Sequence, residues 1–466
     1  MGWISKAGLL GFACGIALTA ASVFAQSAAA GSITPADNQA FQEAQADLDA
    51  GNTTAAELLL RRLQARHPDN YEINESLGLL YASAGRIAQA TPLLSAAARE
   101  APNSDVAHAN LGTAYLKLGR TADAARELTI AARLNPANAG TQQALGQAWM
   151  LEKQPAKAAT AFEAALAHGG DDAALLYNAA LALFNSGNAA EAEPLLARMP
   201  NVETSAEAQS LYGDIDEQLG HYEDAAKHDA NAVRLDPSEA NLYMLGIEFL
   251  RHWTFDPAAK EFEAGVRMFP HSQRMRLGLG VALYGGGRYD QAIPVFADLL
   301  DENPKNTMYA ELLGRTCTVL TEGNQPQCTT LTAYAQQHPK DAILATYAAT
   351  SILHQPADSA QLDVARHLLA AAIRANPDLP EARYGMGLLL QTESAWAKSI
   401  PELEAAIRLR PEYASAHYRL AMALSHTGQH EQARAEIALQ QKYNQQEQAG
   451  VDARLKQVTT FLVNMQ

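Results

Sequence analysis

The sequence predicts an all-α chain of stacked helical hairpins, and three observations lead to this fold class. A stretch of 34 residues, 105–138, holds two helical patterns joined by a short turn. The same pattern returns at nearly the same period along most of the 466 residues. Hydrophobic residues make up 48% of the chain, as closely packed helices require. Repetition at this period predicts a solenoid, which grows by stacking units rather than by enlarging one core.

The spacing of residues within 105–138 predicts where its two helices begin and end. Apolar residues three or four positions apart, including Leu111 and Tyr115, form a stripe along the first helix. Gly119 suits the left-handed position that ends a helix. Thr121 is the expected N-cap of the second helix, and Pro136, which lacks an N–H, ends that helix.

Two small residues predict that the helices of this unit cross closely. Gly112 lies in the first helix and Ala124 in the second, and small side chains at a crossing allow the helix axes to approach to about 8–10 Å. A single hairpin of this kind leaves apolar surface on both sides. It therefore needs neighbouring hairpins to cover it, and the recurring sequence supplies them.

The residues Leu111, Gly112, Tyr115, Ala124 and Pro136, at a period of 34, resemble the tetratricopeptide repeat, here of an exported bacterial type. The resemblance implies about twelve repeats in a right-handed superhelix, with the first helix of each repeat lining a concave groove. It also implies a non-enzymatic scaffold that binds protein or peptide partners.

The register of this unit divides the chain into repeats over 37–446. The repeats are 37–70, 71–104, 105–138, 139–172, 173–204, 206–239, 240–272, 273–306, 307–340 and 341–378, followed by two more. The fifth closes early at Pro200, and the tenth carries an extra stretch after His354. Kinks are therefore expected near 200 and within 328–360. Residues 447–466 are expected to form a capping helix or a tail.

The first 25 residues are typical of a secretory signal peptide. Lys6 precedes an apolar run that ends near Val23, and Ala25 closes a site of small residues suited to cleavage. Residues 26–36 are expected to be a polar lead-in. The alternative is an uncleaved anchor helix. Lipid attachment at Cys14 is disfavoured because Gly11 occupies a position where an aliphatic residue is usual.

The charge of the chain argues against nucleic acid as a partner. The formal charge is −16, and removing 1–25 takes away Lys6 and no acidic residue, which gives −17. An acidic surface repels phosphate groups. Beyond the N-terminus no apolar run is long enough to predict a membrane span. We expect an exported, periplasmic protein.

The repeat register also pairs two cysteines. Cys317 takes the aromatic position of the first helix in the ninth repeat, and Cys328 lies near the small position of the second helix. These positions face each other in the family, and an oxidising compartment favours a bridge. A disulfide is predicted, with two buried thiols as the alternative.

No residue pattern predicts a catalytic, metal or cofactor site. His426 and His430 are four residues apart, but Gly428 places a turn between them. The glycine-rich stretch 284–288 lacks the lysine and the preceding strand of a phosphate-binding loop. The serines lack the G-x-S-x-G setting of a nucleophile. The sequence therefore predicts a protein that is not an enzyme.

The resemblance places the second, fifth, ninth and twelfth residues of each repeat toward the groove. Aromatic and aliphatic side chains there, with neighbouring polar ones, offer contact area at low entropy cost and hydrogen bonds for a peptide. The predicted groove residues are Tyr177, Asn178, Phe184, Asn185, Tyr243, Ile247, Arg251, Leu277, Tyr284, Tyr384 and Tyr418. The alternative is that single rings only pack between adjacent first helices.

Other inward positions are acidic, including Glu72, Glu75 and Glu207. The lysine and asparagine clamp with which some family members hold acidic carboxyl tails is therefore not visible. Two functions remain open. The first is a periplasmic scaffold that binds protein segments in the groove. The alternative is a component of an envelope machine for polysaccharide or pilus export.

Overall fold

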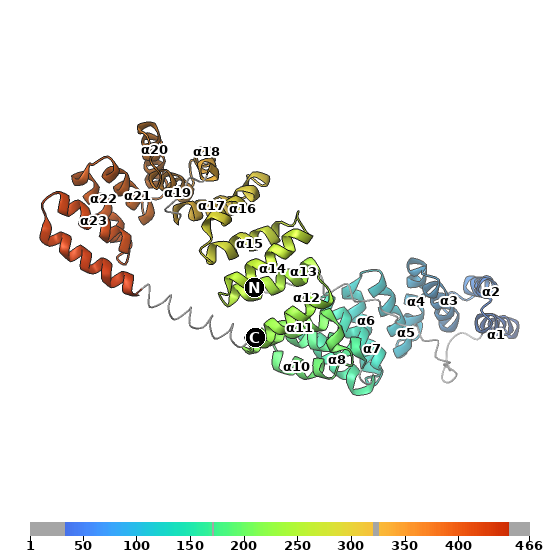
Figure 1. Ribbon diagram of the computed structural model, residues 1–466. Helices are drawn as coiled ribbons and strands as arrows, with labels where there is room; N and C mark the ends of the chain where they lie inside the picture. Colours follow the sequence, from blue (N-terminus) through green and yellow to red (C-terminus); the bar gives the residue numbers. More distant parts are fainter. Residues whose placement is uncertain (1–32, 170–171, 320–325, 447–466) are drawn as a thin grey trace. The chain divides into compact units, whose positions relative to one another are not determined.

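The computed structural model describes residues 33–169, 172–319 and 326–446, and within these ranges all regular secondary structure is helical. The chain divides after His221 into two compact units. In each unit, consecutive helices form hairpins that stack on one another (Figure 1). The number of hairpins is consistent with about twelve repeats. The predicted all-α repeat architecture is confirmed.

The first unit alternates first and second helices of similar length. Its helices are α1 (Pro35–Asp49), α2 (Thr53–Arg66), α3 (Tyr71–Ser83), α4 (Ile87–Glu100), α5 (Asp105–Lys117), α6 (Thr121–Leu134), α7 (Ala139–Leu151), α8 (Pro155–Gly169), α9 (Ala173–Asn185), α10 (Ala189–Ala197), the 3-10 helix η2 (Val202–Thr204) and α11 (Ala206–Leu219).

The second unit continues the same alternation. Its helices are α12 (Tyr222–Leu235), α13 (Glu239–Arg251), α14 (Phe255–Met268), α15 (Gln273–Gly285), α16 (Tyr289–Glu302), α17 (Thr307–Val319), the 3-10 helix η3 (Pro326–Thr329), α18 (Thr330–Gln337), α19 (Ala342–Leu353), α20 (Ser359–Ala375), α21 (Pro380–Thr392), α22 (Trp396–Leu409) and α23 (Ala414–His426). A further helix is described over 430–446.

First helices and second helices begin differently. The Ser104 hydroxyl accepts the Ala107 N–H at 3.2 Å and caps α5, and most other first helices have a comparable cap. The prediction that Thr121 caps α6 was wrong. Thr121 is the first helical residue, and its hydroxyl donates to Glu152 of the next repeat. The turn itself fixes the start of α6, because the Arg120 N–H donates to the Tyr115 carbonyl at 2.9 Å.

The turn inside most of the described hairpins contains one residue with positive φ. Gly119 has φ +72°, as predicted, and nothing lies near the place that a Cβ would take. Lys153, Trp253 and Ser394 adopt the same conformation, with φ near 60°. A left-handed conformation costs a non-glycine residue roughly 1–2 kcal/mol. These three turns are therefore held by the packing of their hairpins.

The glycine near the middle of a first helix is in contact with the second helix of the same hairpin. A Cβ on Gly112 would lie 2.6 Å from Leu128 Cγ, and one on Gly146 would lie 2.6 Å from Phe162 Cε1. Leu128 and Phe162 are fully buried. The close crossing that the small residues predict is present.

A polar side chain in the first turn of several first helices ties its repeat to the one before. It contacts the carbonyl oxygen of the proline that closes the preceding repeat, a group left without a partner at a helix end. The pairs are Asn74–Pro68 at 2.7 Å, His108–Pro102 at 3.2 Å, Gln142–Pro136 at 3.1 Å and His417–Pro411 at 2.8 Å. His108 and His417 also contact Glu127 and Glu436, one helix further on.

Irregular hairpins occur near both predicted kink positions. The second helix α10 has only 9 residues and is followed by η2, and α18 has only 8 residues and follows η3. Helix α1 begins at Pro35 rather than at 37, because Thr34 caps it at 3.2 Å.

Two predicted terminal segments lie outside the described residues. They are the signal peptide, 1–25, and the C-terminal cap or tail, 447–466. Among the residues that are described, no helix combines the length and the apolar character needed to cross a bilayer.

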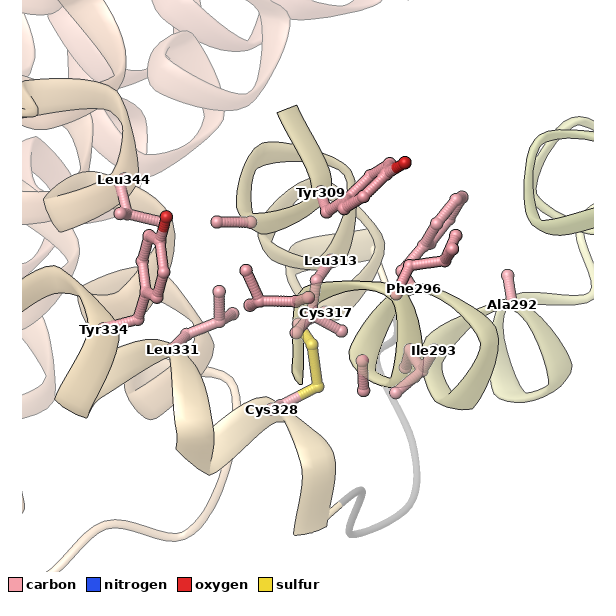
Figure 2. Packing of buried hydrophobic residues seen from close by; sticks show 14 of the residues in the cluster. Ala292, Ile293, Phe296, Tyr309, Leu313, Cys317, Cys328, Leu331, Tyr334 and Leu344 are labelled. Atoms are coloured by element: carbon pink, nitrogen blue, oxygen red, sulfur yellow. A yellow bond between two sulfur atoms is a disulfide. The ribbon is translucent and has the colours of Figure 1, made fainter. Parts of the chain in front are cut away.

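The expected bridge between Cys317 and Cys328 is present and joins α17 to η3 (Figure 2). The two Cα atoms are 5.9 Å apart, and both side chains are buried. Phe296 of α16 and Leu331 of α18 belong to the same core cluster as the disulfide. The bridge thus holds η3 in the core of a hairpin whose second helix is short.

Candidate functional site

In the first unit, the predicted groove residues lie together on α9. These residues are Tyr177, Asn178, Phe184 and Asn185. Tyr177 and Phe184 are half-buried and pack on the local core, while Asn185 is exposed. Burial, with the nearby carboxylates of Glu207 and Asp214, raises the pKa of Tyr177 to about 12. The rings of Tyr177 and Phe184 therefore pack on the core and remain partly exposed to solvent.

In the second unit, the predicted groove residues are distributed over several first helices. They are Tyr243, Ile247 and Arg251 on α13, Leu277 and Tyr284 on α15, Tyr384 on α21 and Tyr418 on α23. Tyr418 is 46% exposed, whereas Tyr243 and Tyr284 are half-buried against the core. Arg251 pairs with Glu248 of its own helix at 3.2 Å.

Five side chains of this unit form a surface that we call the tyrosine–arginine row. It consists of Tyr284 (α15), Arg315 (α17), Tyr347 (α19), Tyr384 (α21) and Tyr413, the residue before α23. Two contacts join its members, and a longer-range electrostatic interaction adds to them. Arg315 hydrogen-bonds to Tyr347 and is within electrostatic reach of Tyr284, and the rings of Tyr384 and Tyr413 have centroids 5.0 Å apart.

Arg315 is the charged centre of the row. Its side chain is exposed, and no carboxylate of the described chain forms an ion pair with it. The hydrogen bond to Tyr347, with the nearby Tyr284 and Glu311, raises the pKa of Arg315 further. A guanidinium has five N–H donors, so the single bond to Tyr347 leaves most of them available to a partner.

Two tyrosines of the row are favoured in their neutral form, because burial raises the pKa of Tyr284 and of Tyr413. Within the described part of the chain, no residue accepts a hydrogen bond from the hydroxyl of Tyr284 or Tyr384. These two hydroxyl groups can therefore donate to a bound molecule.

Two carboxylates of the same unit, one on α21 and one on α22, form ion pairs with arginines. Glu381 pairs with Arg410, which also lies over the Tyr413 ring at 4.8 Å. Glu402 pairs with Arg383 at 2.9 Å. The row thus presents ring faces and hydrogen-bond donors, and these two carboxylates each pair with an arginine.

Gly314 places Tyr347 beside Arg315. In a regular hairpin the equivalent glycine meets the second helix, as Gly280 meets Phe296. In the ninth repeat a Cβ on Gly314 would instead lie 2.7 Å from Tyr347 Cβ. Helix α18 begins late, and α17 packs directly on α19. The irregular hairpin therefore creates the contact at the centre of the row.

Sequence reasoning missed three members of the row. Arg315 occupies the ninth position of its repeat, which the register already assigns to the groove, and this position could have revealed it. Tyr347 and Tyr413 lie at other positions. They enter the row because the packing of α17 on α19 and the ring contact with Tyr384 are irregular features that no period predicts.

The structure corrects the placement of Glu75, which the register assigns to an open, acidic groove. Glu75 is only 8% exposed and accepts a hydrogen bond from Asn110 of α5. Burial raises its pKa to about 7. The cause is the packing of α3 on α5, which encloses the side chain at the fifth position of this repeat.

Comparison with known families gives matches over much of the chain. Profiles described as tetratricopeptide repeat match residues 41–105 and 243–307, 81–148 and 150–215, and 402–435. No curated protein sequence matches the chain.

Several solved structures are similar in fold. Naa15/Naa10 bound to HypK-THB is 16% identical, with 87% of this chain and 68% of that chain covered and a TM-score of 0.39. PilF of Pseudomonas aeruginosa is 19% identical, with 44% and 94% covered and a TM-score of 0.36. YrrB, described as a repeat protein with an unusual peptide-binding site, is 18% identical, with 39% and 95% covered and a TM-score of 0.34.

Proposed function

Because the chain belongs to the tetratricopeptide repeat family, we propose that it is a non-enzymatic scaffold that binds protein segments on the first helices of its repeats. The observation that carries this proposal is the tyrosine–arginine row. Binding energy at protein interfaces concentrates in tyrosine, tryptophan and arginine side chains. The row places such side chains on neighbouring helices, with one exposed arginine for which the described chain shows no ion pair.

A site-specific photocrosslinker tests the position of the binding surface. We would introduce it at Tyr347 in the row and, as a control, at Met268, which is 50% exposed on the second helix α14. We expect crosslinks to a partner from position 347 and few from position 268. Equal crosslinking from both positions, or none from 347, would contradict the proposal.

The partner captured in this way also separates the two functions left open by the sequence. Several different extended polypeptides would favour a general scaffold. A single partner in fixed ratio, belonging to a membrane-embedded complex, would favour a component of an export machine. Replacing Tyr284 and Tyr384 together by alanine, with the crosslinker kept at position 347, should abolish either capture, since both depend on the row.

We also propose that the protein is exported and acts in the periplasm. Two features support this: the signal-like segment 1–25 and the disulfide between Cys317 and Cys328. The mass of the protein purified from its native cell tests both. We expect a mature chain that begins at Gln26 and has no thiol that reacts before reduction. An intact N-terminus, or two reactive thiols, would contradict the proposal.

A further inference from the structure

We propose that the first helices of the first unit bind a polypeptide segment rich in lysine and arginine. The surface consists of α1, α3, α5, α7, α9 and α11, and we call it the acidic first-helix layer. It belongs to the other unit and does not use the tyrosine–arginine row, so the inference goes beyond the proposed function and can fail alone. Two independent observations support it: the distribution of charge between first and second helices, and a buried carboxylate oxygen without a partner.

The first helices of this unit are strongly acidic, whereas its second helices are balanced. Four acidic residues lie on α1, two on α3, one on α5 and four on α11. On these six helices, all of them within the described residues, Lys117 is the only lysine or arginine, which gives a formal charge of −10. The second helices α2, α4, α6, α8 and α10 carry seven acidic and seven basic residues. The excess negative charge of the hairpins therefore lies on the first helices.

Neighbouring first helices contact each other, so their charges act together. The contacts join α3 to α5, α5 to α7 and α9 to α11. Three carboxylates from α3 and α5 act on the Tyr71 phenol: Glu72, Glu75 and Asp105. Asp105 accepts a hydrogen bond from the neutral Asn135 at 2.8 Å, which leaves its charge in place. Like charges gathered on one face attract a cationic partner and speed its association.

Glu75 is the second observation, because one of its oxygens lacks a hydrogen-bond donor. The residue is only 8% exposed, and its Oε1 accepts a hydrogen bond from Asn110. Its Oε2 is buried and has no hydrogen-bond partner among the described residues. A buried acceptor without a partner costs about 1–3 kcal/mol. Lysine and arginine side chains carry N–H donors and no acceptor, so a cationic side chain of the partner would complete the hydrogen bonding of this carboxylate.

Helices α9 and α11 place an aromatic ring beside carboxylates. Tyr177 of α9 is half-buried and lies within electrostatic reach of Glu207 and Asp214 of α11. A lysine or arginine can lie over the face of such a ring, as Arg86 lies 4.2 Å from the centre of the Tyr81 ring in the same unit. A cationic side chain would therefore gain both the ring and the carboxylates here, whereas an acidic segment would be repelled.

The experiment measures binding of the purified mature chain to three labelled peptides of equal length by fluorescence anisotropy. One peptide is rich in lysine and arginine, one in glutamate, and one in glycine and serine. We expect only the cationic peptide to bind. Its affinity should fall by at least about tenfold between low and high ionic strength, because salt screens exposed charges.

Two double variants with the same net charge locate the bound segment. Glu72→Gln with Glu207→Gln removes two charges from the acidic first-helix layer, and the affinity for the cationic peptide should fall by about three- to tenfold. Glu163→Gln with Glu191→Gln is the matched control, because it removes two charges from exposed positions on the second helices α8 and α10. The control should bind as the original chain does. Circular dichroism verifies that each variant is folded.

The outcomes separate this inference from the proposed function. Equal losses in the two double variants would mean that net charge alone attracts the peptide, and would overturn the assignment to the first helices. Failure of the cationic peptide to bind, or equal binding of all three peptides, would overturn the inference as well. Capture of a partner at position 347 would still support the tyrosine–arginine row in each of these cases. If the cationic peptide binds as expected and position 347 captures nothing, this inference holds and the proposed surface on the second unit fails.

Discussion

The contact between Gly146 and Phe162 allows a quantitative test of how the hairpins pack. In Gly146→Ala, the new Cβ would lie 2.6 Å, 2.7 Å and 2.8 Å from three carbons of the Phe162 ring. Carbon atoms in favourable contact are about 3.5–4.0 Å apart, so the ring must move by about 1 Å. Phe162 is fully buried at the centre of its hairpin, and a movement of this size displaces its neighbours.

Two opposing terms set the expected change in stability. Overpacking a core typically costs about 1–3 kcal/mol, while alanine is about 1 kcal/mol more favourable than glycine inside a helix. The difference between these terms predicts that Gly146→Ala lowers the free energy of unfolding by about 0–2 kcal/mol. Gly140→Ala in the same helix is the control. Its Cβ would meet only Asn138 Oδ1 at 3.5 Å, so it should raise stability by up to about 1 kcal/mol.

Urea unfolding followed by far-ultraviolet circular dichroism gives the two changes. Because repeat proteins open locally, hydrogen exchange in α7 and α8 verifies that the effect arises in this hairpin. The two substitutions are chemically identical and lie in one helix, yet Gly146→Ala should leave the protein less stable than Gly140→Ala does. A Gly146→Ala protein stabilised as much as the Gly140→Ala protein would refute the packing argument.

Three further predictions concern the buried acid, a strained turn and the disulfide. Burial gives Glu75 a folded pKa of about 7 against the ordinary 4.5. The folded state then retains a proton that the unfolded state has lost, so stability should fall as pH rises from about 4.5 to about 7, by on the order of 3 kcal/mol. Glu75→Gln should remove this dependence; an unchanged pH profile of the unfolding free energy would contradict it. Lys153→Gly should raise the melting temperature, with a gain of about 0.5–1 kcal/mol, because glycine adopts positive φ without strain; a lower melting temperature would argue against strain at this turn. The Cys317→Ser, Cys328→Ser double variant should lose about 3 kcal/mol, the loop-closure value for a separation of 11 residues. Hydrogen exchange should then be fastest in α18, and a uniform increase along the chain would count against a local effect.

Much of the fold follows from the sequence because the repeat signature consists of packing residues. Gly112 and Gly119 occupy positions that only a small or a left-handed residue fills without strain, so their recurrence locates most of the hairpins and turns. The residues at which the second helices begin are harder to predict from the sequence. Thr121 looks like a cap by residue type, but the preceding turn places Arg120 at the N-cap position and Thr121 at the first helical position.

The candidate site was only partly predictable, and its members show why. Tyr284 and Tyr384 follow from the register, since the repeat assigns their positions to the first-helix face. Tyr347 does not, because its position depends on a hairpin whose second helix begins late and leaves Gly314 open to the next repeat. A repeating signature describes what the repeats share, whereas a binding site is built from the places where they differ.

The short second helix of the ninth repeat also affects how the second unit unfolds. In a linear array each repeat is stabilised only by its nearest neighbours, so a weak repeat divides the array into blocks that melt separately. A covalent bond at that position restores the connection without requiring a full helix. The bridge between Cys317 and Cys328 would then set the size of the cooperative block, and reduction would turn one unfolding transition of this unit into two.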